Sequence, residues 1–123
     1  MDRETVKIHE KDEIGEVQIA NEVVAIIAGL AATEVEGIVG MVGGLKGDIV
    51  ELLGKKNLAK GVNVEVGDEN ISLELSVIVA FGANIPTVSK AVQEKVKSAV
   101  ETMTGLIVEE VNVHISGVDV PNK

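Results

Sequence analysis

The chain of 123 residues contains no cysteine, no tryptophan and no tyrosine, and its only aromatic residue is Phe81. The absence of cysteine excludes disulfides, thiolate nucleophiles and cysteine-ligated metal sites. With a single aromatic ring, the sequence offers no stacking platform of the kind on which proteins bind unpaired bases. The core must therefore be built from Val, Ile, Leu and Ala, which favour packed sheets and close helix contacts.

Positive charge is also scarce. The chain has 11 Lys and Arg against 20 Asp and Glu, a formal net charge of −9, which repels phosphate backbones and anionic lipid surfaces. The longest apolar run, residues 23–32, has about half the length of a membrane span. Residues 1–7 are charged and lack the apolar segment of a signal peptide. We therefore expect a cytoplasmic protein with no direct membrane insertion, and we do not expect nucleic acid as its general partner.

Residues 85–115 organise the chain as a helix followed by a strand. Ile85-Pro86 opens the helix, because proline is tolerated at the first helical position. Gly105 follows the last residue of the apolar period and can take the left-handed conformation that ends a helix. Apolar and polar side chains alternate over residues 111–115, which predicts a half-buried strand with His114 on its exposed face. The apolar period of the helix consists of Val88, Val92, Val96, Ala99, Val100 and Met103.

The N-terminal part predicts a tail, a strand and an unusually apolar helix. We interpret residues 1–13 as a flexible tail and residues 14–120 as one domain, with a first strand at 15–20. The helix over residues 22–34 is apolar on nearly every side, yet only one of its sides can face a sheet. Its remaining apolar side chains either pack against the second helix or form a surface for self-association. The residues that we expect on such a surface are Ile26, Ile27 and Leu30.

The middle of the chain supplies the remaining strands. We expect a short, glycine-broken strand within residues 36–44, a short helix within 45–54 and a turn-rich connector at 55–61. Alternating residues on either side of Gly67-Asp68-Glu69-Asn70 predict a hairpin. Together these elements predict an α/β (α+β) fold, a two-layer sandwich with a small mixed sheet and two main helices on one face. The expected order is strand, helix, short helix, strand, strand, helix, strand.

The sequence shows no constellation of catalytic or metal-binding residues. His9 and His114 are its only histidines, and neither has a second ligand at metal-binding spacing. The motifs of nucleophile-elbow hydrolases, zinc metalloproteases and P-loop enzymes do not occur. The acidic pairs fall in the tail, in a turn and at a strand start, as is typical of solvated faces: Asp12-Glu13, Asp68-Glu69 and Glu109-Glu110. We therefore predict no catalytic residue, no metal ligand and no cofactor.

One glycine pattern leaves a nucleic-acid function open. Gly44-Leu45-Lys46-Gly47 matches the glycine-x-x-glycine loop with which KH domains clamp a nucleic-acid backbone. It lies in a locally basic part of the chain, whose lysines are Lys46, Lys55, Lys56 and Lys60. The pattern is short, and the glycines of a flexible turn produce it equally well. A KH-like module that uses Gly44, Gly47 and these lysines is the alternative interpretation.

Several blocks of the sequence together point to a known family. They are Gly15-Glu16-Val17-Gln18-Ile19-Ala20, Ala31-Ala32 with Gly37-Ile38, Leu52-Leu53-Gly54-Lys55-Lys56, Ile85-Pro86, Met103-Thr104-Gly105-Leu106 and Val111-Asn112-Val113-His114-Ile115. Over residues 14–118, and in this order, the chain resembles the bacterial alkaline shock protein family, the YloU-like envelope stress response proteins.

The resemblance implies a non-enzymatic protein of Gram-positive-type bacteria that acts in the envelope stress response and in cell-envelope homeostasis. Members of this family are thought to self-assemble and to sit at the cytoplasmic side of the membrane through a separate anchor protein. The resemblance therefore implies a homo-oligomeric protein–protein interaction module with a membrane-anchoring partner, and it carries over no catalytic residues. A paralogue that regulates fatty-acid synthesis is a further alternative within the family.

Overall fold

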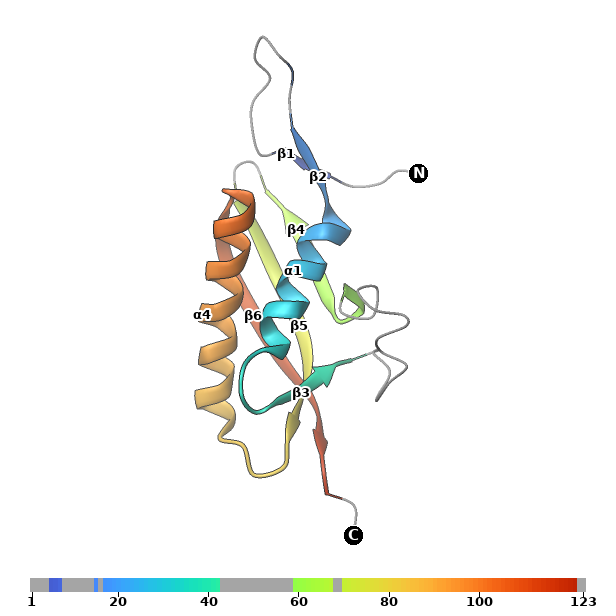
Figure 1. The fold of residues 1–123 in the computed structure, drawn as a ribbon, viewed down its shortest axis with the longest axis vertical. Helices are drawn as coiled ribbons and strands as arrows, with labels where there is room; N and C mark the ends of the chain where they lie inside the picture. Colours follow the sequence, from blue (N-terminus) through green and yellow to red (C-terminus); the bar gives the residue numbers. More distant parts are fainter. Residues whose placement is uncertain (1–4, 8–14, 16, 43–58, 68–69, 122–123) are drawn as a thin grey trace.

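The computed structural model describes residues 5–7, 15, 17–42, 59–67 and 70–121. Four of its strands form the main sheet, while the first two pair antiparallel as a separate sheet beside the start of the first helix (Figure 1). In chain order the elements are β1 (Thr5–Lys7), β2 (Gln18–Ala20), α1 (Asn21–Thr33), β3 (Ile38–Met41), β4 (Val62–Val66), β5 (Asn70–Ala80), α4 (Ile85–Thr104) and β6 (Ile107–Asp119).

The long strand β5 is the centre of the main sheet. On one side it pairs in parallel with β6 along its whole length. On the other side it pairs antiparallel with β4 along its first half and with β3 along its second half, so β3 and β4 lie end to end on the same edge. Their neighbouring ends meet at Ser76, whose C=O accepts from Val42 N–H at 3.0 Å and whose N–H donates to Gly61 C=O at 2.8 Å.

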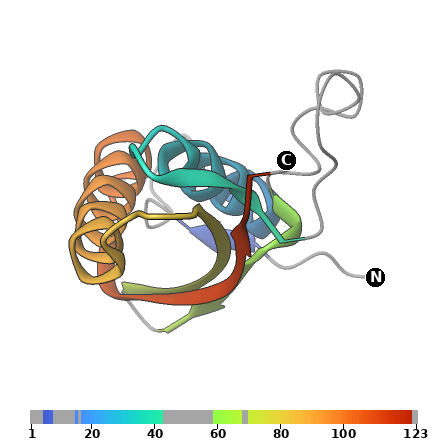
Figure 2. The same ribbon diagram turned by 90° about the horizontal axis from the view of Figure 1, so that it is seen from below.

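Both α1 and α4 lie on one face of this sheet, which curves around them (Figure 2). Alternate residues of β5 face the helices and are buried, whereas Ser72, Glu74 and Ser76 face the opposite side. Because the sheet alternates in this way, each strand contributes one row of side chains to the core. The core is entirely aliphatic at its centre, and its fully buried larger members are Val24, Ile71, Leu73, Leu75, Val77, Val79, Val92, Val96, Val100 and Val108.

Local signals set the two ends of α4. The side chain of Asn84, the N-cap residue, accepts a hydrogen bond from Thr87 N–H at 3.0 Å, and Pro86 occupies the first turn. At the other end Gly105 takes a left-handed conformation (φ 77°), and its N–H donates to Glu101 C=O at 2.8 Å. These contacts satisfy backbone groups that a helix end otherwise leaves without partners.

The N-cap gives a first testable prediction. Replacing Asn84 by alanine removes the acceptor for Thr87 N–H, and we expect the free energy of unfolding to fall by about 1 kcal/mol. Asn84→Asp keeps an acceptor at the same place and should stay within about 0.5 kcal/mol of the unmodified chain. Urea denaturation followed by circular dichroism measures both. An equal loss in the two variants would show that the cap bond does not contribute.

The predicted fold is confirmed, since two layers, a mixed sheet and two helices on one face are all present. The expected order contains neither β1, which residues 5–7 of the expected tail form, nor β3, which spans Ile38–Met41 within the glycine-broken stretch. Two further strands differ from their expected bounds. The last strand runs from Ile107 to Asp119 instead of 111–115, and β2 starts at Gln18, not at residue 15. The short helix expected within 45–54 lies outside the described residues, as do residues 1–4 and 8–13 of the expected tail.

Candidate interaction surface

The buried side of α1 is built mainly from small residues. Ala25, Ala28, Ala31 and Ala32 are buried there together with Val24. Small side chains bring helices close together, and α1 accordingly packs along α4 on the sheet. One of the two interpretations of this apolar helix, packing against the second helix, therefore accounts for this side of α1.

A second row of apolar residues on α1 faces away from the core. Leu30 is 48% exposed and Val23 is 42% exposed, while Ile26 between them is partly buried. These three residues are spaced by three and four positions, so they form one continuous stripe on the helix surface. We call Val23, Ile26 and Leu30 the α1 stripe.

The predicted surface residues Ile26, Ile27 and Leu30 thus lie in different environments. Ile27 is partly buried and packs against the hydrophobic core, whereas Leu30 is exposed. Val23 was not among the predicted residues, although its position seven residues before Leu30 places it on the same helix face. The spacing of 23, 26 and 30 is the sequence signal that could have identified this face.

Charged residues border the α1 stripe. Glu22 lies in the first turn of α1, and Glu34, just beyond its end, forms an ion pair with Lys95 of α4 at 3.4 Å. Both side chains of this pair are about half exposed (54% and 51%), so the pair contributes little to stability. An apolar strip with a charged rim is the usual anatomy of a protein–protein contact surface.

Of the predicted lysines, the structure describes only Lys60. It is exposed in a helical turn before β4 and lines a hollow of about 180 Å³ on the open face of the sheet, together with Asn63, Glu74 and Ser76. The carboxylate of Glu74 in this hollow opposes the binding of a phosphate. Lys46, Lys55, Lys56 and the Gly44–Gly47 loop lie outside the described residues.

The open face of the sheet also carries the one histidine that the structure describes. His114 Nε2 lies 3.2 Å from Glu74 Oε2, and the two side chains are 56% and 50% exposed. Ser76 is the residue opposite His114 in the ladder. This group is open to water, with none of the shielding that strengthens charges in an active site. Within the described residues, no group of three or more metal-ligating side chains is placed to hold a metal ion.

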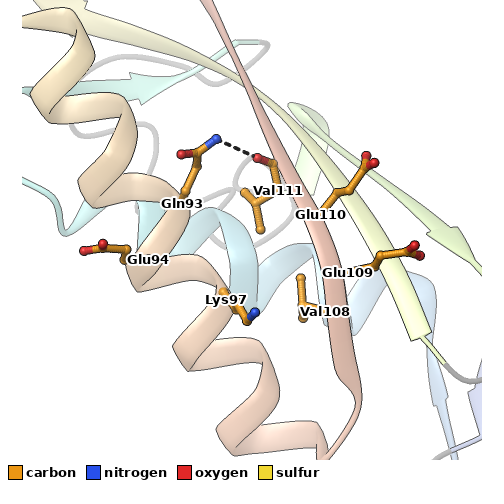
Figure 3. A pocket seen from close by; sticks show the side chains of 7 residues that line it. All are labelled: Gln93, Glu94, Lys97, Val108, Glu109, Glu110 and Val111. Atoms are coloured by element: carbon orange, nitrogen blue, oxygen red, sulfur yellow. Dashed lines mark hydrogen bonds between the residues drawn. The ribbon is translucent and has the colours of Figure 1, made fainter.

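A groove of about 190 Å³ runs between α4 and the first half of β6 (Figure 3). Val108 and Val111 are buried residues of β6 at its base, and Glu94, Lys97 and Glu109 line it as well. Gln93 Nε2 donates to Val111 C=O at 3.0 Å across the groove (Figure 3). One turn beyond Lys97, Glu101 Oε2 accepts from Val108 N–H at 2.9 Å. Side chains of α4 therefore bind backbone groups of β6.

The model of the alkaline shock protein 23 family, described as having a "cell envelope-related function", matches residues 9–120, nearly the whole domain. The chain belongs to this alkaline shock protein family. The resemblance seen in the sequence is thereby confirmed. No described helix is both long and apolar enough to cross a membrane.

Individual relatives agree with this assignment. YqhY of Bacillus subtilis is 41% identical over 94% of the chain and 85% of its own length. YloU of the same organism is 39% identical over 95% of the chain and 99% of its own length. A Streptococcus pyogenes protein named stress response regulator gls24 homolog is 32% identical over 89% of the chain and 60% of its own length. Family and names together support an envelope- or stress-related role.

Solved structures resemble the fold only distantly. MamM CTD is similar over 82% of the chain and 95% of its own length, with a TM-score of 0.48 and 15% sequence identity. A likeness at this level is too weak to support a functional comparison.

Proposed function

We propose that the chain is a non-enzymatic interaction module of the cell envelope stress response, and that it self-associates through the α1 stripe. The observation that carries the proposal is the exposure of Val23 and Leu30 on a helix whose opposite side is already packed against α4. The family description and the stress response names of relatives support the envelope part. At the cytoplasmic side of the membrane, a separate anchoring partner protein would hold the assembly.

The energetics of the stripe favour a contact that needs several residues at once. Fully burying a Val, Leu or Ile side chain contributes about 1.5–3 kcal/mol, so half-exposed residues each gain about 1 kcal/mol more on association. Three such residues on each of two copies give about 6 kcal/mol, similar to the entropic cost of association. The stripe is therefore the centre of an interface rather than the whole of it.

A charge placed in the stripe should abolish this contact without unfolding the chain. Leu30→Glu puts a carboxylate in the apolar strip, yet at a position that is 48% exposed in the single chain. We expect light scattering to give a multiple of 12.9 kDa for the unmodified chain and a smaller mass for Leu30→Glu. Circular dichroism should show the same helix content for both.

Ser98→Glu is the matched control, because Ser98 is exposed on the solvent side of α4 and receives the same charge. It should keep the mass of the unmodified chain. If Leu30→Glu also keeps that mass, the α1 stripe is not an assembly surface.

A further inference from the structure

The outer edge of β6 is open in the part of the chain that the structure describes. β6 pairs with β5 on one side, and no described strand pairs with its other side. The strand is 13 residues long. Long open edges are uncommon in proteins that stay monomeric, because their unpaired N–H and C=O groups can pair with another chain.

The first half of this edge is covered by α4. Gln93 donates to Val111 C=O (Figure 3), and Glu101 accepts from Val108 N–H, so side chains occupy the positions that a further strand would need. The second half of β6 runs away from α4 toward the C-terminus (Figure 1). Among the described residues, this second half is the part of the edge that stays accessible.

The direction of the backbone groups follows from the Gln93 bond. Val111 C=O points out of the sheet toward the edge, and residues two apart in a strand point the same way, so the groups of Val113 and Ile115 also point outward. Irregularities in the ladder fall between Val108 and Glu110 and between Ile115 and Gly117. The regular, uncovered part of the edge is therefore centred on Val113 to Ile115.

Exposed apolar side chains gather where this half of β6 ends. Phe81, the only aromatic residue of the chain, is 66% exposed, and its N–H donates to Asp119 C=O at 3.2 Å, which places it beside the end of β6. Val118 and Val120, on either side of Asp119, are 46% and 62% exposed. An aromatic ring held outside an aliphatic core is typical of a contact residue.

We propose that this half of β6 pairs antiparallel with the same strand of a second copy, across a two-fold axis near Ile115. The charges favour a second copy. Residues 111–118 carry no formal charge in a chain of net charge −9, so the residues that face one another near the axis bring no like charges together. Asp119 of one copy approaches Glu110 of the other only at the ends of the paired segment. The antiparallel arrangement places Glu110 of the two copies about 30 Å apart, at about 3.3 Å per residue. That separation is well beyond the screening length of about 8 Å at physiological salt.

A second copy also brings a strand that is already formed. A disordered peptide would have to be ordered on binding, which lowers its affinity. This inference rests on the proposed function, in that it takes self-association as given, but it uses a different surface. The α1 stripe lies on the helix that covers β3 and β4, and β6 lies on the opposite side of β5.

Single cysteines test the proposal directly, because the chain has none of its own. His114→Cys, Ile115→Cys and Ser116→Cys span the expected axis, where facing Cα atoms of an antiparallel pair are about 4.5–5.5 Å apart, within disulfide range. We expect at least one of them to form a disulfide-linked dimer about tenfold faster, or more, than Ser98→Cys on α4 under mild oxidation at micromolar protein.

The Leu30→Glu background separates the two proposals. If the cysteines on β6 still cross-link when Leu30→Glu is also present, the edge contact is supported even if the α1 stripe has no role in assembly. Rates at all three positions equal to that of Ser98→Cys would overturn the edge contact, whatever the mass of the unmodified chain. A second result would also overturn the edge contact. If cross-linking is slow and an added extended peptide protects the Val113 and Ile115 amides from hydrogen exchange, the occupant of this edge is a peptide and not a second copy.

A charge at the axis, placed on an exposed side chain, provides a second measurement. Ser116→Glu brings two like charges close together across the proposed two-fold axis, which should weaken the dimer about fivefold or more. Ser98→Glu adds the same charge elsewhere and should leave the dissociation constant unchanged. Sedimentation velocity measures both, and equal constants would contradict the proposed pairing.

Discussion

Replacing Leu75 by alanine should lower the free energy of unfolding by about 3 kcal/mol. Leu75 lies in the middle of β5, is 0% exposed, and is flanked in the ladder by Val62 of β4 and Val113 of β6. Because Leu75 is packed between the sheet and the helices, its neighbours cannot move in to fill the cavity that the alanine leaves. A domain of this size has a total stability of about 5–15 kcal/mol, so the loss is a large share. Urea denaturation of the isolated chain measures it.

Leu30→Ala is the matched control for the same chemical change. Leu30 is 48% exposed, so the same truncation should lower the free energy of unfolding by less than about 1 kcal/mol. Both variants should be measured at low protein concentration, because association would add stability to any chain that keeps the α1 stripe. Similar losses in the two variants would mean that the stripe belongs to the core and is not a free surface.

Gly37→Ala is the second substitution with a large expected effect. Gly37 joins α1 to β3 with φ +101°, a conformation that side chains rarely adopt, and an added Cβ would lie 2.8 Å from Val88 Cγ2. Val88 is 7% exposed in the first turns of α4 and has little room to move. Backbone strain and the steric conflict together should cost about 2–3 kcal/mol.

Gly40→Ala, three residues further on, separates these causes from a general effect of removing glycine. Gly40 has no positive φ, and a Cβ there would meet nothing within 4 Å. Its unfolding free energy should change by no more than about 0.5 kcal/mol, because the alanine also restricts the unfolded chain. Thermal and urea denaturation of the pair give the comparison. A loss at Gly40 as large as that at Gly37 would contradict the steric explanation.

The helix α4 could be predicted closely from sequence because its limits are local. Pro86 and Gly105 act through their own backbone preferences, and the apolar period between them needs no knowledge of the rest of the fold. The two-layer architecture could be predicted from similarly local information. Each amphipathic element has one apolar face, and few arrangements bury all of those faces together.

The extent of β6 could not be predicted, because the ladder is irregular. Val108 and Val111 are both buried although they are three residues apart, since a register shift beside Glu109 interrupts the alternation. A second shift lies beside Ser116. A period-two pattern therefore appears only between them, in residues 111–115, which is the part that the sequence identified.

The sequence indicated that α1 had more apolar surface than one sheet can cover, but not which residues would remain exposed. Ile27 and Leu30 are both apolar and only three positions apart, yet Ile27 contacts the core and Leu30 does not. Their difference depends on where α4 lies beside α1. The open edge of β6 is likewise a property of strand order, which local patterns do not encode.

The mass of the unmodified chain as a function of concentration tests the central claim most directly. Sedimentation velocity from about 1 µM to about 1 mM covers association free energies of about −8 to −4 kcal/mol. Our account predicts a mass that rises above 12.9 kDa within this range. A constant mass of 12.9 kDa across the whole range would contradict self-association through either surface.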